Sequence, residues 1–369
     1  MKQKIKIAIG FIISVALLYF LYSVIDFQLF LESLKSANYL YVMLGITVYL
    51  LAYFANTKRW QIILLANGFQ HVPFYQIYKI VTMSYMLNML LPAKVGEVSK
   101  AYFLVKKVKT PLGIAVATVV TERFFDMVTV ALFLVIPLFI LDLFDSIRVT
   151  FPDLIEGLGD RLIQSFPSLK DSVSSLKTMD FTHFIEIPLY IYVSAIALGF
   201  VIILIFRKNY SLLVRIIQKL MFWMPDDHQF FQRIHRFFSQ LKFFSHPKEL
   251  LEILFFSVLI WGLYLMSFYA FLQAFHVDIQ VIHITFIIGV SAIMVAVPSA
   301  PGGLGPFEIG FTVATVLVLG LKWESHFVSV VSTAIVLHVS HMLSISVIGL
   351  YHFIKSNISL KDLKEDKAA

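Results

Sequence analysis

Long apolar segments separated by short polar stretches fill almost the whole sequence. The apolar segments lie at about 6–25, 39–57, 74–91, 111–144, 187–206, 250–275, 279–322 and 326–354. A helix needs about 17–25 apolar residues to cross a hydrocarbon core, and each segment is long enough. Because a helix satisfies its own backbone hydrogen bonds in lipid, the pattern predicts an all-α polytopic membrane protein.

The polar stretches differ in charge, and the positive-inside rule converts that difference into a topology. Basic stretches follow the segments at 39–57, 187–206 and 326–354, whereas the stretch at 145–186 is acidic. The first segment lacks a small-residue cleavage site and is expected to remain as a helix. We therefore predict a multi-pass protein of the cell (plasma) membrane, with cytoplasmic N- and C-termini and an external loop at 145–186.

Two of the apolar segments are broken by proline and glycine. The first break lies at 92–96, and a full crossing there would place the lysines that follow it outside. The second break lies at 298–306, in a segment whose two ends are both predicted to be external. Proline removes a backbone donor and glycine loosens the chain, so each break predicts the tip of a re-entrant hairpin. Two full crossings are the alternative.

The chain then divides into two similar halves, at about 5–144 and 187–355, within one transmembrane domain at 1–355. Each half holds two spans, a broken hairpin and a third span, and the loop at 145–186 joins them. Because each half crosses the membrane an odd number of times, the two halves have opposite orientations and form an inverted repeat. Paired broken segments in such a repeat indicate a transport site near the bilayer midplane. A polar cytoplasmic tail is expected at 356–369.

Composition agrees with this interpretation and excludes several classes of protein. Of the 369 residues, 59% are hydrophobic and 14% charged, against roughly 45–50% and 25% in soluble domains. An ordinary cytosolic enzyme and a disordered chain are therefore excluded, and the lack of cysteine excludes disulfides and thiol nucleophiles. The net charge is +7, and the basic residues lie in short segments between apolar runs. This placement indicates contact with anionic lipid headgroups and not with nucleic acid.

The first broken segment presents Asn88, Lys94, Glu97 and Lys100. If a helix resumes after the break, its three charged residues share one face at a spacing of three. Charged side chains inside a membrane are candidate functional groups, and the neighbouring break argues that protein surrounds them. The alternative is an interfacial Lys–Glu pair that reaches out to water.

Glu122, Arg123 and Asp126 interrupt an otherwise apolar segment. Their spacings of three and four allow an ion-paired patch on one side of a helix. Each charge facing lipid near the bilayer centre would cost about 2.5–3.5 kcal/mol, so these side chains are expected to face protein or water. A purely structural ion pair is an equal alternative. Arg59, before Trp60 at the end of a span, is most simply an interfacial anchor and alternatively a phosphate contact.

The second break carries Gly302, Gly303 and Gly305, followed by Glu308. Glycines would let backbone N–H groups approach an anionic headgroup, with the positive end of the next helix aimed at the tip. Close helix packing by small residues is the alternative. His338 and His341 are expected to form hydrogen bonds between helices, because no third metal ligand accompanies them. The sequence predicts no catalytic residue, metal site or cofactor.

The chain resembles the lysylphosphatidylglycerol synthase transmembrane (flippase-like) family, the membrane region of the multiple peptide resistance factor, over about residues 5–355. The motifs that carry this resemblance are Lys58-Arg59-Trp60, Asn88 to Lys100 with Pro92 and Gly96-Glu97, Glu122-Arg123 with Asp126, and Pro298 to Glu308. The family is associated with moving a modified phospholipid between leaflets. Lys94 and Lys100 stand where the family often has arginine, which keeps the charge but loses bidentate phosphate recognition. Only about 15 polar residues follow the last span, so synthase activity is not implied.

The sequence therefore predicts a lipid translocase, of flippase or scramblase type, that moves a phospholipid or lipid-linked phosphate between leaflets. Its predicted substrate-binding residues are Arg59, Asn88, Lys94, Glu97, Lys100, Glu122, Arg123, Asp126, Gly302, Gly303, Gly305 and Glu308. In this interpretation the lysines and arginines contact phosphate. The carboxylates pair with those cations, bind a cationic headgroup or carry a proton.

Two other functions stay open: an integral-membrane enzyme on polyprenyl-phosphate substrates, and a non-catalytic membrane partner of a separate lipid-modifying enzyme. A transporter is favoured over an enzyme because no catalytic set stands out. The expected partners are membrane lipids with anionic or aminoacylated headgroups, and nucleic acid is not among them. A homo-oligomer and a separately encoded lipid-modifying enzyme are further candidates.

Overall fold

The computed structural model describes residues 26–69, 72–91, 94–140, 247–296, 300–320 and 323–356, together with isolated positions elsewhere. Several predicted features fall outside those continuous ranges. They are the spans at 6–25 and 187–206, the loop at 145–186, the basic stretch before residue 247, the tail after residue 356, and Pro92, Ala93, Pro298 and Ser299 of the two breaks.

The described part of the chain is built from helices and contains no strand. The helices are α2 (Phe27–Ser36), α3 (Tyr39–Ala66), α4 (Phe74–Leu90), α5 (Val95–Val108), α6 (Leu112–Ile140), α12 (Pro247–Ala274), α13 (Val281–Ala296), η3 (Pro301–Gly303), α14 (Pro306–Leu319) and α15 (Trp323–Ile354). Within these ranges, five helical segments are long and apolar enough to cross a membrane. The predicted all-α, multi-pass architecture is confirmed.

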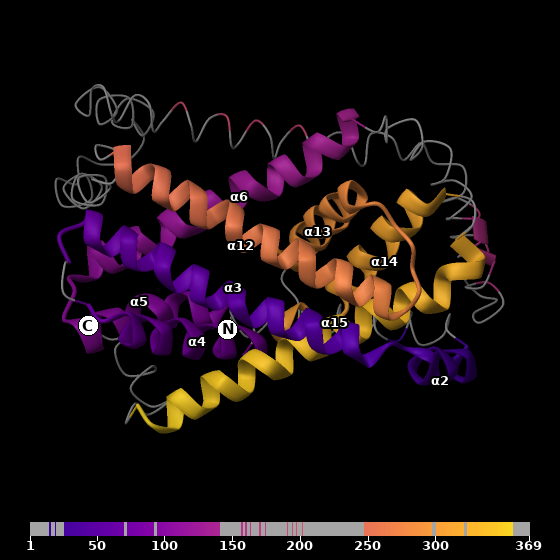
Figure 1. The fold of residues 1–369 in the computed structure, drawn as a ribbon, viewed down its shortest axis with the longest axis horizontal. Helices are drawn as coiled ribbons and strands as arrows, with labels where there is room; N and C mark the ends of the chain where they lie inside the picture. Colours follow the sequence, from indigo (N-terminus) through magenta and orange to yellow (C-terminus); the bar gives the residue numbers. More distant parts are fainter. Residues whose placement is uncertain are drawn as a thin grey trace.

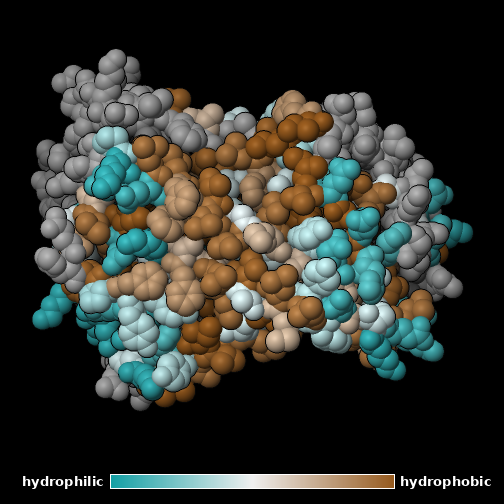
Figure 2. Space-filling model, in the orientation of Figure 1, coloured by the Kyte–Doolittle hydropathy of each residue, from teal (hydrophilic) through white to brown (hydrophobic). Residues whose placement is uncertain are grey.

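Large hydrophobic side chains are exposed on the outer faces of the long helices. Met43 on α3, Phe139 on α6, Phe255 on α12 and Val347 on α15 are between 63% and 70% exposed. Figure 2 shows hydrophobic residues across the middle of the visible face, and hydrophilic residues gathered toward the two ends of the long axis. Lipid-facing helices require this distribution when the long axis follows the membrane normal.

Helices α3 and α12 run antiparallel and lie side by side along the molecule (Figure 1). At one end the backbone N–H of Asn38 donates to the carbonyl of Ala274 at 2.9 Å. Further along, the Ser267 hydroxyl donates to the carbonyl of Gly45 at 2.8 Å. A Cβ at Gly45 would lie 2.6 Å from the ring of Phe271, so glycine permits the close approach of the two helices.

The two predicted breaks separate short helices that fold back on each other. Between α4 and α5 the chain turns at Lys94, whose φ of 51° is left-handed. Between α13 and α14 it passes through η3 and turns at Gly302 and Gly303, whose φ values of 71° and 83° suit glycine. In Figure 1, α4 and α5 lie at one end of the long axis, and α13 and α14 lie toward the other.

The hairpin helices α4, α5, α13 and α14 have 17, 14, 16 and 14 residues, against about 20 for a full crossing. Together, η3 and α14 form a 19-residue apolar segment that approaches this length. The two hairpin tips meet inside the molecule: a Cβ at Gly302 would lie 3.3 Å from the carbonyl oxygen of Met89 on α4. The helix lengths and the meeting of the tips fit re-entrant hairpins. The re-entrant geometry and the inverted repeat stay predictions.

Gly96 makes the tightest contact between the helices of the first hairpin. A Cβ there would overlap the backbone carbonyl oxygen of Ser84, which cannot swing away as a side chain can. Gly96→Ala is expected to lower the free energy of unfolding by about 1–3 kcal/mol, the usual cost of overpacking. The measurement is the melting midpoint of the purified protein in detergent. Gly113→Ala is the matched control, since a Cβ there meets nothing within 4 Å; equal midpoints for the two variants would contradict this packing.

Candidate functional site

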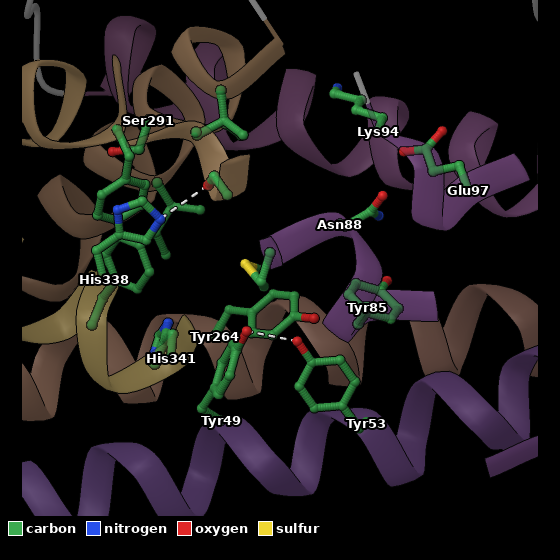
Figure 3. Close-up of a pocket in the computed structure, with 18 of the residues that line it drawn as sticks. Tyr49, Tyr53, Tyr85, Asn88, Lys94, Glu97, Tyr264, Ser291, His338 and His341 are labelled. Carbon is green, nitrogen blue, oxygen red and sulfur yellow. Dashed lines mark hydrogen bonds between the residues drawn. The ribbon is translucent and has the colours of Figure 1, made fainter. Parts of the chain in front are cut away.

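A cavity of about 360 Å³ lies between the two hairpin tips. Figure 3 shows side chains of the first hairpin on one side of this cavity and His338 of α15 on the other. The predicted site residues that line it are Asn88, Lys94, Glu97, Arg123, Gly302 and Gly303. Residues far apart in the sequence and predicted in separate halves of the chain therefore share one space.

Aromatic side chains form one wall of the cavity. Tyr49 and Tyr53, one turn apart on α3, share a hydrogen bond of 2.6 Å. The Tyr49 ring stacks on His341 with 3.5 Å between ring centroids, and Tyr53 meets Tyr85 edge-on at 4.9 Å. Sequence reasoning missed the three tyrosines, although two tyrosines four apart in the middle of a span are a detectable signal. Their hydroxyls bring polar atoms into an apolar interior.

The rim of the cavity beside Tyr85 is charged, and the Arg123 guanidinium donates to the Tyr85 hydroxyl at 3.2 Å. Lys94 is exposed, and no carboxylate in the described part of the chain lies within ion-pair distance of it. The Arg123 side chain is 33% exposed and lies 3.8 Å from Glu97. The buried side-chain oxygen of Asn88 meets no hydrogen-bond donor among the described residues. The described part of the rim therefore presents one ammonium group that is not neutralised, and a buried acceptor without a hydrogen-bond donor lies beside it.

Behind this rim, ion pairs join three helices. Glu122 of α6 forms an ion pair with Lys100 of α5 at 2.5 Å, and it lies 3.5 Å from both Arg59 of α3 and Arg123. Asp126 forms ion pairs with Arg59 at 2.8 Å and with Arg123 at 3.1 Å. The predicted pairing of these carboxylates with the predicted cations is thus present, and it places them on one side of α6. Their role in substrate binding stays a prediction.

Arg59 lies inside the protein and has 0% exposure. Helix α3 continues to Ala66, past the predicted end of its span at 57. On α12, Ser257 accepts a hydrogen bond of 3.0 Å from Arg59, and the Trp261 ring N–H donates to Asp126 at 3.3 Å. The predicted interfacial anchor is therefore wrong. The carboxylates of α6 neutralise the guanidinium, so the helix can continue past a residue at which hydropathy alone predicts its end.

Glu308 holds the second hairpin tip together. Its Oε2 accepts from the backbone N–H of Gly305 at 2.7 Å, and its Oε1 lies 2.6 Å from Nδ1 of His338. The other ring nitrogen of His338, Nε2, lies 3.1 Å from the carbonyl oxygen of Gly302. Because a carbonyl oxygen only accepts, Nε2 carries a hydrogen. The contact between Nδ1 and Glu308 then holds one proton, shared between the imidazole and the carboxyl group.

These contacts decide between some of the alternatives for the second tip. Within the described residues, Glu308 pairs with His338 and not with a predicted lysine or arginine. Its two other predicted roles, binding a cationic headgroup and carrying a proton, stay predictions. The Gly305 N–H, expected to face a headgroup, is already satisfied by Glu308. His341 Nε2 lies 2.9 Å from the Ser267 hydroxyl of α12, so both histidines link helices, as predicted. No group of three metal-ligating side chains occurs in the described part of the chain.

The sequence model of one family, described as the lysylphosphatidylglycerol synthase transmembrane region, matches residues 7–154 and 172–349. The chain belongs to this family. The matched residues include both hairpins, the ion-pair network and the cavity. The resemblance predicted from the sequence motifs is therefore confirmed.

The chain is also similar to a UPF0104 membrane protein of Methanocaldococcus jannaschii. The two are 32% identical over 147 residues, which is 39% of this chain and 43% of that protein. The match thus spans less than half the length of the relative. No solved structure matches the chain at a significant level.

The network around Glu122 predicts a strong effect of removing one partner. Glu122→Gln leaves Lys100 and Arg59 short of a counter-charge, and breaking a buried pair on one side costs about 3–5 kcal/mol. We expect a large fall in the melting midpoint in detergent. The double variant Lys100→Met, Glu122→Gln removes both members of the shortest pair and is expected to recover part of that loss. Strictly additive effects of the two substitutions would contradict a direct pair.

The shared proton at Glu308 predicts opposite behaviour for two substitutions. Glu308→Gln can retain every hydrogen bond, since its amide oxygen accepts from Gly305 and its amide N–H donates to Nδ1 of a neutral His338. Glu308→Ala loses both contacts and leaves the Gly305 N–H without an acceptor, at about 1–3 kcal/mol. Melting midpoints near wild type for the Gln variant and clearly lower for the Ala variant are expected. An equal loss in both would show that Glu308 is ionised and needs a charged partner.

Proposed function

We propose that the protein moves an anionic lipid between the leaflets of a membrane, with the headgroup passing through the cavity between the hairpin tips. The observation that carries this proposal is the position of the cavity. It brings Lys94, Arg123 and Asn88 to the middle of a molecule whose flanks are apolar. Membership of a family described by a phospholipid synthase membrane region supports a lipid as the cargo.

A polar path is the physical requirement for lipid transfer. A charged headgroup loses its hydration in hydrocarbon, which opposes spontaneous exchange. Hairpin tips that meet inside the protein replace part of that hydration with side-chain donors and acceptors. The exposed apolar faces of the long helices leave the acyl or prenyl tails in lipid. In this proposal the two hairpins are re-entrant, belong to inverted halves, and open alternately toward the two leaflets.

Lys94 and Arg123 have different roles in this proposal. Lys94 is a mobile point charge without a carboxylate partner in the described residues, so it attracts phosphate first. Arg123 is held in place by Asp126 at 3.1 Å, while its contact with Glu97 at 3.8 Å is long. A phosphate oxygen that displaces Glu97 would gain a planar, fixed donor. The released Glu97, which lines the same cavity as the tyrosine rings, would favour an aminoacylated headgroup that also carries an ammonium group.

Replacement of Lys94 tests this proposal with little risk to the fold, because the side chain is exposed. Lys94→Gln is expected to slow leaflet exchange roughly tenfold or more, since a hydrogen bond to a charged group contributes about 1.5–3 kcal/mol. The measurement is dithionite quenching of a fluorescent phosphatidylglycerol in reconstituted vesicles. Lys109→Gln is the matched control. Lys109 is also exposed, and its backbone is likewise in the left-handed region with a φ of 56°, but it does not line the cavity.

Other results would point elsewhere. Exchange at the wild-type rate in Lys94→Gln would remove the cavity from the path. No exchange by the wild-type protein with any anionic lipid would contradict the translocase itself. Chemical turnover of a polyprenyl phosphate would then support an enzyme, and co-purification with a soluble lipid-modifying enzyme would support a partner role.

A further inference from the structure

A second cavity, of about 540 Å³, lies where the start of α4, the end of α5 and the end of α15 come together. It shares no lining residue with the cavity between the hairpin tips. Its basic lining residues are Lys79, Lys107, His352 and Lys355, and no carboxylate of the described residues lines it. Helices α4 and α5 and the residue just after α15 therefore bring three ammonium groups to one space, without a counter-charge among the described residues of its wall.

The contacts of these lysines within the described residues are with neutral groups. Lys107 donates to the backbone carbonyl of Ser356 at 2.7 Å, and Lys355 donates to the Tyr351 hydroxyl at 2.6 Å. Lys79 lies 4.9 Å from the ring centroid of Tyr75. Each ammonium group has three N–H donors, so every lysine keeps donors for a ligand. Like charges repel one another, and an anion bound among them would remove that repulsion.

The wall of this cavity is held in place from behind. His352, which is buried, lies 2.8 Å from the hydroxyl of Thr82 on α4, and that hydroxyl also donates to the carbonyl of Tyr78 at 3.0 Å. A Cβ on Gly349 of α15 would overlap the side chain of Met86, so α15 and α4 are in close contact here. The cavity is thus a fixed feature between packed helices.

We propose that this cavity binds a phosphate group, and that the bound anion ties the base of the first hairpin to the end of α15. Lysines are common phosphate ligands and act as point charges. Tyr75 and Tyr351 are both exposed beside the lysines, and tyrosines of this kind are typical of the headgroup layer of a membrane. A basic pocket between membrane helices is suited to an anionic lipid headgroup, although a soluble phosphate compound offers the same chemistry.

This site goes beyond the proposed transport function and does not depend on it. Helix α4 carries both cavities, with Lys79 beside the second and Asn88 beside the first. An anion at the base would hold in place the hairpin whose tip presents Lys94. Its binding is measured without any transport.

The test uses the full chain purified in detergent, with binding followed by intrinsic tryptophan fluorescence and by the melting midpoint. The probes are dioctanoyl phosphatidylglycerol, dioctanoyl phosphatidylcholine, and sodium phosphate against sodium chloride at equal ionic strength. The triple variant Lys79→Gln, Lys107→Gln, Lys355→Gln is expected to bind the anionic probe roughly tenfold more weakly or worse. The control triple Lys35→Gln, Lys58→Gln, Lys109→Gln changes the same charge at exposed sites outside both cavities.

Each outcome has a distinct meaning. Phosphatidylglycerol binding that the first triple weakens and the control does not would support a lipid headgroup. Inorganic phosphate binding with the same dependence would support a soluble ligand. Equal affinity in the wild type and both triples, or no binding of any phosphate probe, would overturn the site. If the triple variant unfolds, Lys355→Gln alone is tested, since this exposed residue follows the last helix.

Discussion

Charged side chains in an apolar slab need partners, and the helices of this protein supply them around Glu122 and Asp126. Both residues lie on α6. They form ion pairs with an arginine of α3, a lysine of α5 and the neighbouring Arg123. Hydrophobic contact alone gives little preference for one rotation of a helix in lipid, because lipid tails are as apolar as leucine. Fixed donor and acceptor positions do give that preference. The ion pairs therefore determine which face of each helix turns inward.

Arg123 belongs both to this network and to the cavity. One of its nitrogens contacts Asp126 in the interior, while the other lies near Glu97 at the rim. A ligand that binds this guanidinium acts on the same charges that join α3, α5 and α6. The sequence presents a structural ion pair and a binding residue as alternatives, but the position of Arg123 is compatible with both. The residue has a fixed side and an accessible side.

The sequence was sufficient for the helices, their apolar faces and the two breaks, because each depends on neighbouring residues. Gly302 and Gly303 illustrate this, since a cluster of glycines and prolines predicts a turn from neighbouring residues alone. Partners distant in the sequence were not predictable in the same way. Pairing of Asp126 with one of the predicted cations was expected, but nothing near Arg59 identifies it as that partner, and nothing near Lys79 indicates that residues 107 and 355 will join it. The shared proton between Glu308 and His338 likewise required the distance between two helices.

The burial of Arg59 has a consequence for the order in which the protein is made. Its carboxylate partner Asp126 follows it by 67 residues, and Ser257 follows it by 198. During synthesis α3 therefore reaches the membrane long before the groups that neutralise its arginine. The insertion machinery tolerates such a charge at about 2.5–3.5 kcal/mol when the rest of the helix is apolar. Newly inserted α3 therefore carries its arginine without these partners until α6 arrives with the carboxylates that neutralise it.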